Sequence, residues 1–101
     1  MDKISRHFAQ LVRKKLKDNT RKIILFGSHA RGDFTEGSDY DILIVVNHKD
    51  KKIENIVLEA SVEILNKYDA LIGSIICDES EWQQKQNFPL GLNILREGVE
   101  I

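Results

Sequence analysis

The side chains best suited to chemistry lie in one short stretch of the sequence. Gly27 and Ser28 follow an apolar run, and after ten intervening residues Asp39 and Asp41 open a second apolar run. A glycine lets the backbone turn sharply, with no side chain in the way. A serine at the helix start that follows adds a hydroxyl to free backbone N–H groups and to the positive end of the helix. This turn is therefore a candidate phosphate cradle.

The two acids form a candidate metal site. Asp39 and Asp41 stand two residues apart at the entry to an expected strand, so both side chains leave the same face, about 6.5–7 Å apart along the backbone. Carboxylates this close repel each other and raise each other's pKa unless a cation binds. Mg²⁺ favours one or two carboxylates together with substrate phosphate oxygens. A lone Gly-Ser or Asp-x-Asp is usually a helix cap or a turn, but the two joined at this spacing favour metal-assisted chemistry on a nucleoside triphosphate.

Alternating helices and strands must position these residues. Apolar stripes predict helices from about Asp2 to Lys17 and over 51–67, and short apolar runs predict strands over Lys22–Phe26, Tyr40–Val46 and Leu71–Cys77. The other expected elements are a short helix through Ala30 and Arg31, one containing Trp82 and capped by Asp78 or Ser80, one from Pro89 through Leu95, and a terminal strand over Val99–Ile101. This alternation favours a sheet with helices packed on it.

Length and composition restrict the class of protein. The 101 residues are 42% hydrophobic and 31% charged with a net charge of −1, which predicts a single domain over residues 1–101. The longest apolar runs are far shorter than the roughly 20 residues that span a bilayer, and no secretory signal is evident. A single cysteine, Cys77, excludes an intrachain disulfide and a cysteine-based zinc site. We expect a cytoplasmic protein with no membrane partner.

Basic residues gather at the N-terminal end of the chain. The first 22 residues contain eight Lys or Arg and only two acids. This stretch is read either as a solvated helix face or as a surface for phosphates or an acidic protein. No aromatic residue is interleaved with the bases near the end of the first helix, which does not favour nucleic acid as a partner.

The motif residues carry a family resemblance. The stretch Gly27-Ser28, ten residues, then Asp39-Tyr40-Asp41 resembles the signature of the DNA polymerase β-type nucleotidyltransferase superfamily. With Ala30-Arg31-Gly32, Ser38 and so short a chain, the sequence is most similar to the minimal nucleotidyltransferases (MNT). These are the antitoxin halves of HEPN/MNT toxin–antitoxin pairs in bacteria and archaea. The Arg96-Glu97-Gly98-Val99 ending agrees with this resemblance.

The resemblance implies a fold, a reaction and a partner. The fold would be an α/β (α+β) nucleotidyltransferase fold, a small mixed sheet with helices packed mainly on one face. Gly27 and Ser28 would contact the β- and γ-phosphates of ATP, and Asp39 and Asp41 would hold Mg²⁺, expected as two ions. The chain would transfer AMP from ATP to a hydroxyl, expected to be a tyrosine of a partner HEPN-domain toxin whose RNase activity is thereby silenced. Whether the chain also forms homo-oligomers is left open by the sequence.

One departure from the superfamily pattern bears on catalysis. A third carboxylate usually stands on a neighbouring strand, but Leu71–Cys77 contains no acid, and the equivalent position falls on Gly73 or Ser74. Asp69 and Asp78 flank this strand out of register. Two alternatives to the transferase therefore stay open: a catalytically weak antitoxin that neutralises its partner by complex formation, and a small-molecule nucleotidyltransferase.

Several other side chains have more than one interpretation. Arg31, with Ser38, belongs to the expected nucleotide-binding set, but it could instead brace the turn by bonding Asp39 or Asp33. We expect His29 to face solvent and Cys77 to be a small core residue. Two aromatic residues could cover the sheet or form a partner-facing patch: Trp82 and Phe88.

Overall fold

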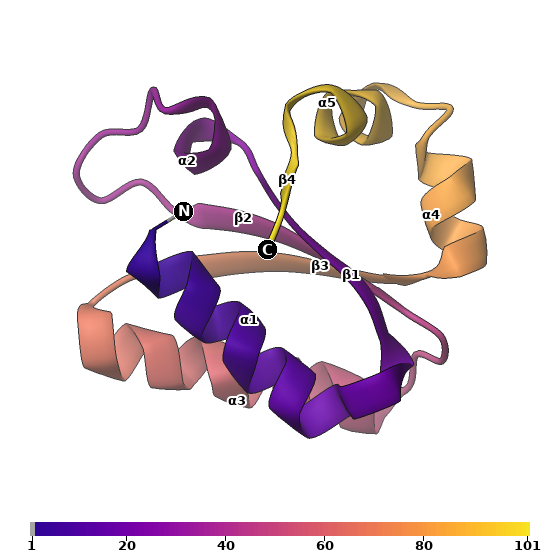
Figure 1. The fold of residues 1–101 in the computed structure, drawn as a ribbon, viewed down its shortest axis with the longest axis horizontal. Coiled ribbons are helices and arrows are strands. Elements are labelled where there is room, and N and C mark those ends of the chain that lie inside the picture. The colour runs from indigo at the N-terminus through magenta and orange to yellow at the C-terminus, as the bar shows by residue number, and fades with distance from the viewer. Residues whose placement is uncertain (1) are drawn as a thin grey trace.

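The computed structural model describes residues 2–101, which form a four-stranded mixed sheet with helices on both faces (Figure 1). The helices are α1 (Lys3–Leu16), α2 (Ser28–Arg31), α3 (Lys51–Tyr68), α4 (Glu79–Lys85) and α5 (Pro89–Glu97), with a 3-10 turn η1 (Lys17–Asn19) after α1. The strands are β1 (Thr20–Phe26), β2 (Tyr40–Val46), β3 (Ile72–Asp78) and β4 (Val99–Glu100). The α/β (α+β) class and the predicted order of elements are confirmed.

The sheet topology brings the two halves of the motif together. The strand order is β3-β2-β1-β4, with β2 antiparallel to β1 and parallel to β3, and β4 antiparallel to β1. In this register Asp41 lies beside Phe26 on one side and beside Gly73 on the other. The strand that carries Asp41, with Asp39 directly before it, is therefore central, and the turn at Gly27 begins directly beside it.

The two long helices pack side by side on one face of the sheet (Figure 1). Each begins at an aspartate whose carboxylate accepts a backbone N–H: Asp2 accepts from Ser5 and Asp50 from Ile53, both at 2.9 Å. Their apolar stripes meet alternate residues of β1 and β2. The buried members of this core are Phe8, Ala9, Val12, Leu16, Ile23, Leu25, Tyr40, Ile42, Ile44, Val46, Val57, Ala60 and Ile64.

A second, smaller core fills the opposite face, which also carries Asp41. Side chains alternate along a strand, so the residues adjacent in sequence to the first core point the other way. They pack against Trp82 of α4 and Ile94 of α5, and α4 is capped by Asp78, whose carboxylate accepts the Glu81 N–H at 2.8 Å. The strand members of this core are Ile24, Phe26, Leu43, Val45 and Cys77.

The smaller core shows the positions of Cys77 and Trp82. Cys77 is fully buried, as expected, and burial raises the pKa of its thiol to about 11. Trp82 is buried and covers the sheet, whereas Phe88 is 63% exposed. The described part of the chain contains no helix long and apolar enough to cross a membrane.

Candidate functional site

The turn after β1 has the geometry expected of the phosphate cradle. Gly27 has φ of 77°, and its carbonyl oxygen accepts the backbone N–H groups of Ala30 and Arg31 as α2 begins. A Cβ at Gly27 would overlap the Asp41 carboxylate. Both the backbone angle and the space therefore require glycine. The Ser28 hydroxyl has no hydrogen-bond partner within residues 2–101, which leaves it available to a ligand.

The pKa of the Asp41 carboxyl is raised above its ordinary value. Burial, and then the negative charge of Asp39, raise the pKa of the Asp41 carboxyl, while His29 and Arg31 act in the opposite direction. A divalent cation would relieve both the burial cost and the repulsion. Within residues 2–101 no cluster of three or more His, Cys, Asp or Glu side chains could hold a metal by itself. Two carboxylates that need phosphate oxygens to complete the coordination fit Mg²⁺.

The position of the missing third carboxylate is Gly73. Gly73 pairs directly with Asp41 across β2 and β3, and a Cβ there would lie 3.5 Å from Asp41 Oδ1, an ordinary contact distance. Ser74 instead lies on the face that α3 covers, where it lines a hollow with Ile72 and residues of α3. The sequence left Gly73 and Ser74 as the two positions that could correspond to the third carboxylate. The strand register favours Gly73, because Gly73 faces the same side of the sheet as Asp41.

The two acids near the ends of β3 lie in different settings. Asp69 ends α3 in the left-handed conformation, with φ of 56°. Asp78 pairs with Val46 and caps α4, five residues beyond Gly73 and so roughly 16 Å along the strand. Asp78 is therefore too far along the strand to replace the absent carboxylate, whereas Asp69 lines a hollow together with Ser38 and Tyr40.

His29 connects the two halves of the motif, so the expectation that it faces solvent is wrong. Its ring stacks on Tyr40 with centroids 3.7 Å apart and on Phe34 with centroids 4.4 Å apart. Nε2 lies 3.0 Å from the carbonyl oxygen of Ser38, so Nε2 carries the proton and donates it. The first turn of α2 places this ring over the start of β2. The motif alone does not indicate this contact, because it depends on the path of the loop between α2 and β2.

Ser38 stabilises the loop between α2 and β2. Its hydroxyl accepts the Thr35 backbone N–H at 3.0 Å and lies 3.2 Å from the Thr35 hydroxyl. With the His29 bond to its carbonyl, Ser38 thus fixes the loop on both its side-chain and its backbone groups. Contact of Ser38 with a nucleotide stays a prediction.

Arg31 braces the turn, one of the two roles left open by the sequence. Its Nε donates to Asp33 at 3.1 Å and its Nη1 to Glu97 at 3.0 Å. Asp33 foremost, with Glu97, raises the guanidinium pKa above its ordinary value. Of the two acids considered for the brace, Asp33 forms the bond, and no bond joins Arg31 to Asp39.

Glu97 is the site residue that sequence reasoning missed. Besides Arg31, Glu97 Oε1 accepts the Gly27 backbone N–H at 3.3 Å, and the side chain is only 18% exposed. The available signal was the Arg-Glu-Gly-Val ending, which contributed to the resemblance without a role for its acid. Nothing in the local pattern connects two residues 70 positions apart.

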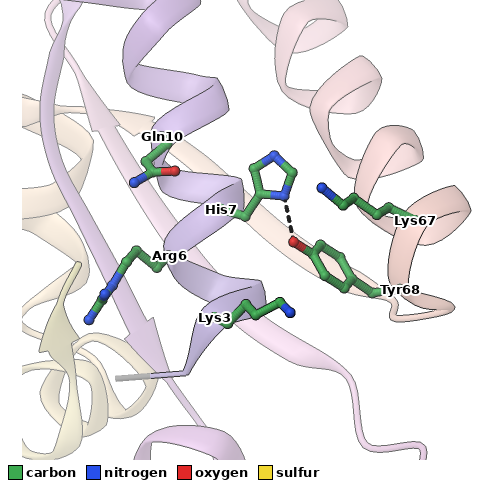
Figure 2. A pocket seen from close by; sticks show the side chains of 6 residues that line it. All are labelled: Lys3, Arg6, His7, Gln10, Lys67 and Tyr68. Carbon is green, nitrogen blue, oxygen red and sulfur yellow. Dashed lines mark hydrogen bonds between the residues drawn. The ribbon is translucent and has the colours of Figure 1, made fainter.

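A basic hollow lies between α1 and α3 (Figure 2). It has a volume of about 460 Å³ and is lined by Lys3, Arg6, His7, Gln10, Lys67 and Tyr68. Figure 2 shows the bond between His7 Nδ1 and the Tyr68 hydroxyl, 2.8 Å long, that ties the two helices together. Its lining contains no carboxylate, so this hollow does not fit a metal-dependent site.

Comparisons with known proteins identify relatives of this chain. The family model for the nucleotidyltransferase domain matches residues 5–89. A protein of Methanocaldococcus jannaschii, named as a candidate protein adenylyltransferase, is 38% identical over 96% of this chain and 93% of its own length.

Solved structures share the fold. A toxin–antitoxin complex of MntA and HpeT matches with a TM-score of 0.63 and 19% identity, over 96% of this chain and 70% of the matched chain. A tri-AMPylated HEPN toxin of Shewanella oneidensis in complex with its MNT antitoxin matches with a TM-score of 0.52 and 14% identity, over 96% of this chain and 70% of the other.

Proposed function

Since the chain belongs to the nucleotidyltransferase domain family, we propose that it transfers AMP from ATP to a hydroxyl, expected to be a tyrosine, of a partner HEPN-domain toxin, and so acts as an antitoxin. The observation that carries the proposal is the close approach of the Asp41 carboxylate to Gly27, where a Cβ would overlap it. It joins a turn suited to phosphates with a carboxylate pair suited to a cation. The relative named for protein adenylylation and the toxin–antitoxin complexes with this fold support the choice of acceptor.

The proposed site uses the side chains in distinct roles. The Gly27–Ser28 turn binds the β- and γ-phosphates, with the free Ser28 hydroxyl as a donor, and Asp39 and Asp41 hold Mg²⁺. When bound, the metal supplies positive charge that stabilises the phosphate oxygens during transfer. Asp33 and Glu97 already hold the guanidinium of Arg31, so we assign Arg31 to the turn and not to the nucleotide.

The transfer step is written as an in-line displacement. The acceptor oxygen forms a bond to the α-phosphorus of ATP, and the bond from that phosphorus to the oxygen bridging to the β-phosphate breaks. Pyrophosphate leaves with that electron pair, and the hydroxyl proton passes to water. A positioned general base typically contributes about 10²–10⁴-fold, and Gly73 offers none on β3, so we expect a slow reaction that depends on its partner.

The absence of an acid at Gly73 also supports a second candidate function, that of a binding-type antitoxin. A chain that retains nucleotide binding but lacks the third carboxylate could neutralise its partner by complex formation alone. A small-molecule acceptor is less favoured, because the two hollows beside Tyr40 are lined by neither Asp39 nor Asp41.

Intact-mass spectrometry of the cognate HEPN-domain partner tests the proposal. After incubation with the chain, ATP and Mg²⁺, the partner should gain the mass of one or more AMP groups. The Asp39→Asn/Asp41→Asn variant should leave the partner unmodified. An unmodified partner in a stable complex that blocks its RNase activity would favour the binding-type antitoxin instead.

A further inference from the structure

The C-terminal segment lies against the turn that follows β1. α5 ends at Glu97, and after Gly98 the strand β4 pairs with β1, with Val99 opposite Leu25 (Figure 1). The Ile101 N–H adds a bond to the Ile23 carbonyl oxygen at 2.9 Å. Extending the antiparallel register by two residues from Val99 places Glu97 opposite Gly27. The register of β4 thus determines which residue meets the phosphate turn.

Packing around Gly98 holds this arrangement. A Cβ at Gly98 would overlap the carbonyl oxygen of Ile94 and the side chain of Ile24. Ile94, which is 1% exposed, anchors α5 in the smaller core. The chain therefore approaches β1 closely at this point, and Glu97 has little freedom to leave the turn.

The Glu97 carboxylate bonds two groups of the turn at once. Oε1 accepts the Gly27 N–H at 3.3 Å and the Arg31 Nη1–H at 3.0 Å, and Arg31 bonds Asp33 in addition. Hydrogen bonds to charged groups are stronger than those between neutral groups. Glu97 thereby fixes the backbone at the residue that contacts Asp41, and it orients the guanidinium that balances its own charge beside the phosphate site.

We propose that Glu97 is a positioning residue for nucleotide binding, which holds Gly27 and Arg31 so that the turn accepts a triphosphate, and that it makes the site dependent on the β4 register. This inference rests on the proposed function, because the ligand is the triphosphate of that reaction. Glu97 acts through the turn and does not itself contact the reacting atoms.

The first test measures the turn without any ligand. In ¹⁵N–¹H correlation spectra the Gly27 amide proton should move upfield in Glu97→Ala, because it loses its acceptor. In Glu97→Gln the shift should be smaller, since the amide oxygen can still accept. Glu100→Ala is the matched control, because Glu100 is exposed on the same segment and its ion pair is with Lys22, at 3.8 Å. A Gly27 resonance unchanged in Glu97→Ala would overturn the inference whether or not the chain binds nucleotide.

The second test measures nucleotide binding by isothermal titration with Mg²⁺ and a non-hydrolysable ATP analogue. We expect Glu97→Ala to bind about tenfold more weakly than wild type, which corresponds to about 1.4 kcal/mol. Glu97→Gln should recover most of the affinity, and Glu100→Ala should match wild type. Equal affinity of Glu97→Ala and wild type would overturn the positioning role alone. A wild-type chain that binds no nucleotide would overturn the proposed function, and this role with it.

Discussion

His29 and Tyr40 stack face to face, with ring centroids 3.7 Å apart and planes 9° from parallel. His29 follows Ser28 in the chain, and Tyr40 stands between the two acids, Asp39 and Asp41. The stack therefore joins the phosphate turn to the carboxylate pair through their immediate neighbours. The distance between the two halves of the site depends on this contact as well as on the sheet.

Replacing His29 tests that connection. His29→Ala should lower the free energy of unfolding by about 1 kcal/mol, the usual range for an aromatic pair, and should weaken nucleotide binding. His29→Phe keeps a ring in the stack and should recover most of the stability. Urea denaturation measures the free energy of unfolding, and isothermal titration with Mg-ATP measures the binding. The control is His48→Ala. His48 is exposed, its ring pairs with Asp50, and its backbone bonds the Asn19 side chain. The connection is refuted if the alanine and phenylalanine variants at position 29 behave alike.

Gly27 and Gly32 provide a matched pair for the turn. Both have positive φ, 77° and 87°, so alanine is strained at either position, by about 1–3 kcal/mol. Only at Gly27 would the new Cβ overlap Asp41, since nothing lies within 4 Å at Gly32. Isothermal titration with Mg-ATP should thus show a large loss of affinity for Gly27→Ala, and for Gly27→Val a loss larger than for Ser28→Ala. Gly32→Ala should retain affinity. Equal losses in the two alanine variants would contradict the placement of the site.

The raised pKa of Asp41 predicts a pH dependence of stability. A carboxyl whose pKa is higher in the folded state favours folding while it is protonated, and this contribution is lost as the pH rises through the folded-state pKa. Without Mg²⁺ at neutral pH, Asp41→Asn should therefore melt at a higher temperature than wild type. The difference in melting temperature between the two proteins should disappear as the pH falls through the raised pKa of Asp41 toward the ordinary aspartate value of 3.8.

Added Mg-ATP should reverse that order, because ligand binding stabilises only the chain that retains its carboxylates. Asp18→Asn, at an exposed acid in η1, is the control and should follow wild type in both conditions. Lower stability of Asp41→Asn at neutral pH without the cation would show that burial and repulsion do not act on Asp41 as described.

Gly73 allows the missing carboxylate to be restored. Gly73→Asp adds an acid beside Asp41 on the same face of the sheet, and we expect the transfer rate to the partner to rise by about a hundredfold or more, within the roughly 10²–10⁴-fold range of general base catalysis. Ser74→Asp adds the same charge on the face covered by α3 and should bring no gain. Single-turnover kinetics compare the two. A rate that is unchanged in Gly73→Asp would mean that the acid is not what limits transfer.

The sequence was sufficient for the elements and for the two halves of the motif. Apolar periodicity identifies α1 and α3, short apolar runs identify the strands, and Gly27 marks the end of β1. The sequence was not sufficient to predict contacts between distant segments. The bond from Glu97 to Gly27 depends on the register of β4, and the His29 stack depends on the path of the loop 32–39. Neither leaves a periodic signal, because each is a single contact set by tertiary structure.

The position of the label in radioactive ATP tests the central claim most directly. The cognate HEPN-domain partner is incubated with the chain, Mg²⁺ and ATP labelled at either the α- or the γ-phosphate. Transfer of AMP predicts label in the partner from α-labelled ATP only, and none with the Asp39→Asn/Asp41→Asn variant. Label from γ-labelled ATP, or no label in a partner that is nonetheless bound and inhibited, would contradict the account.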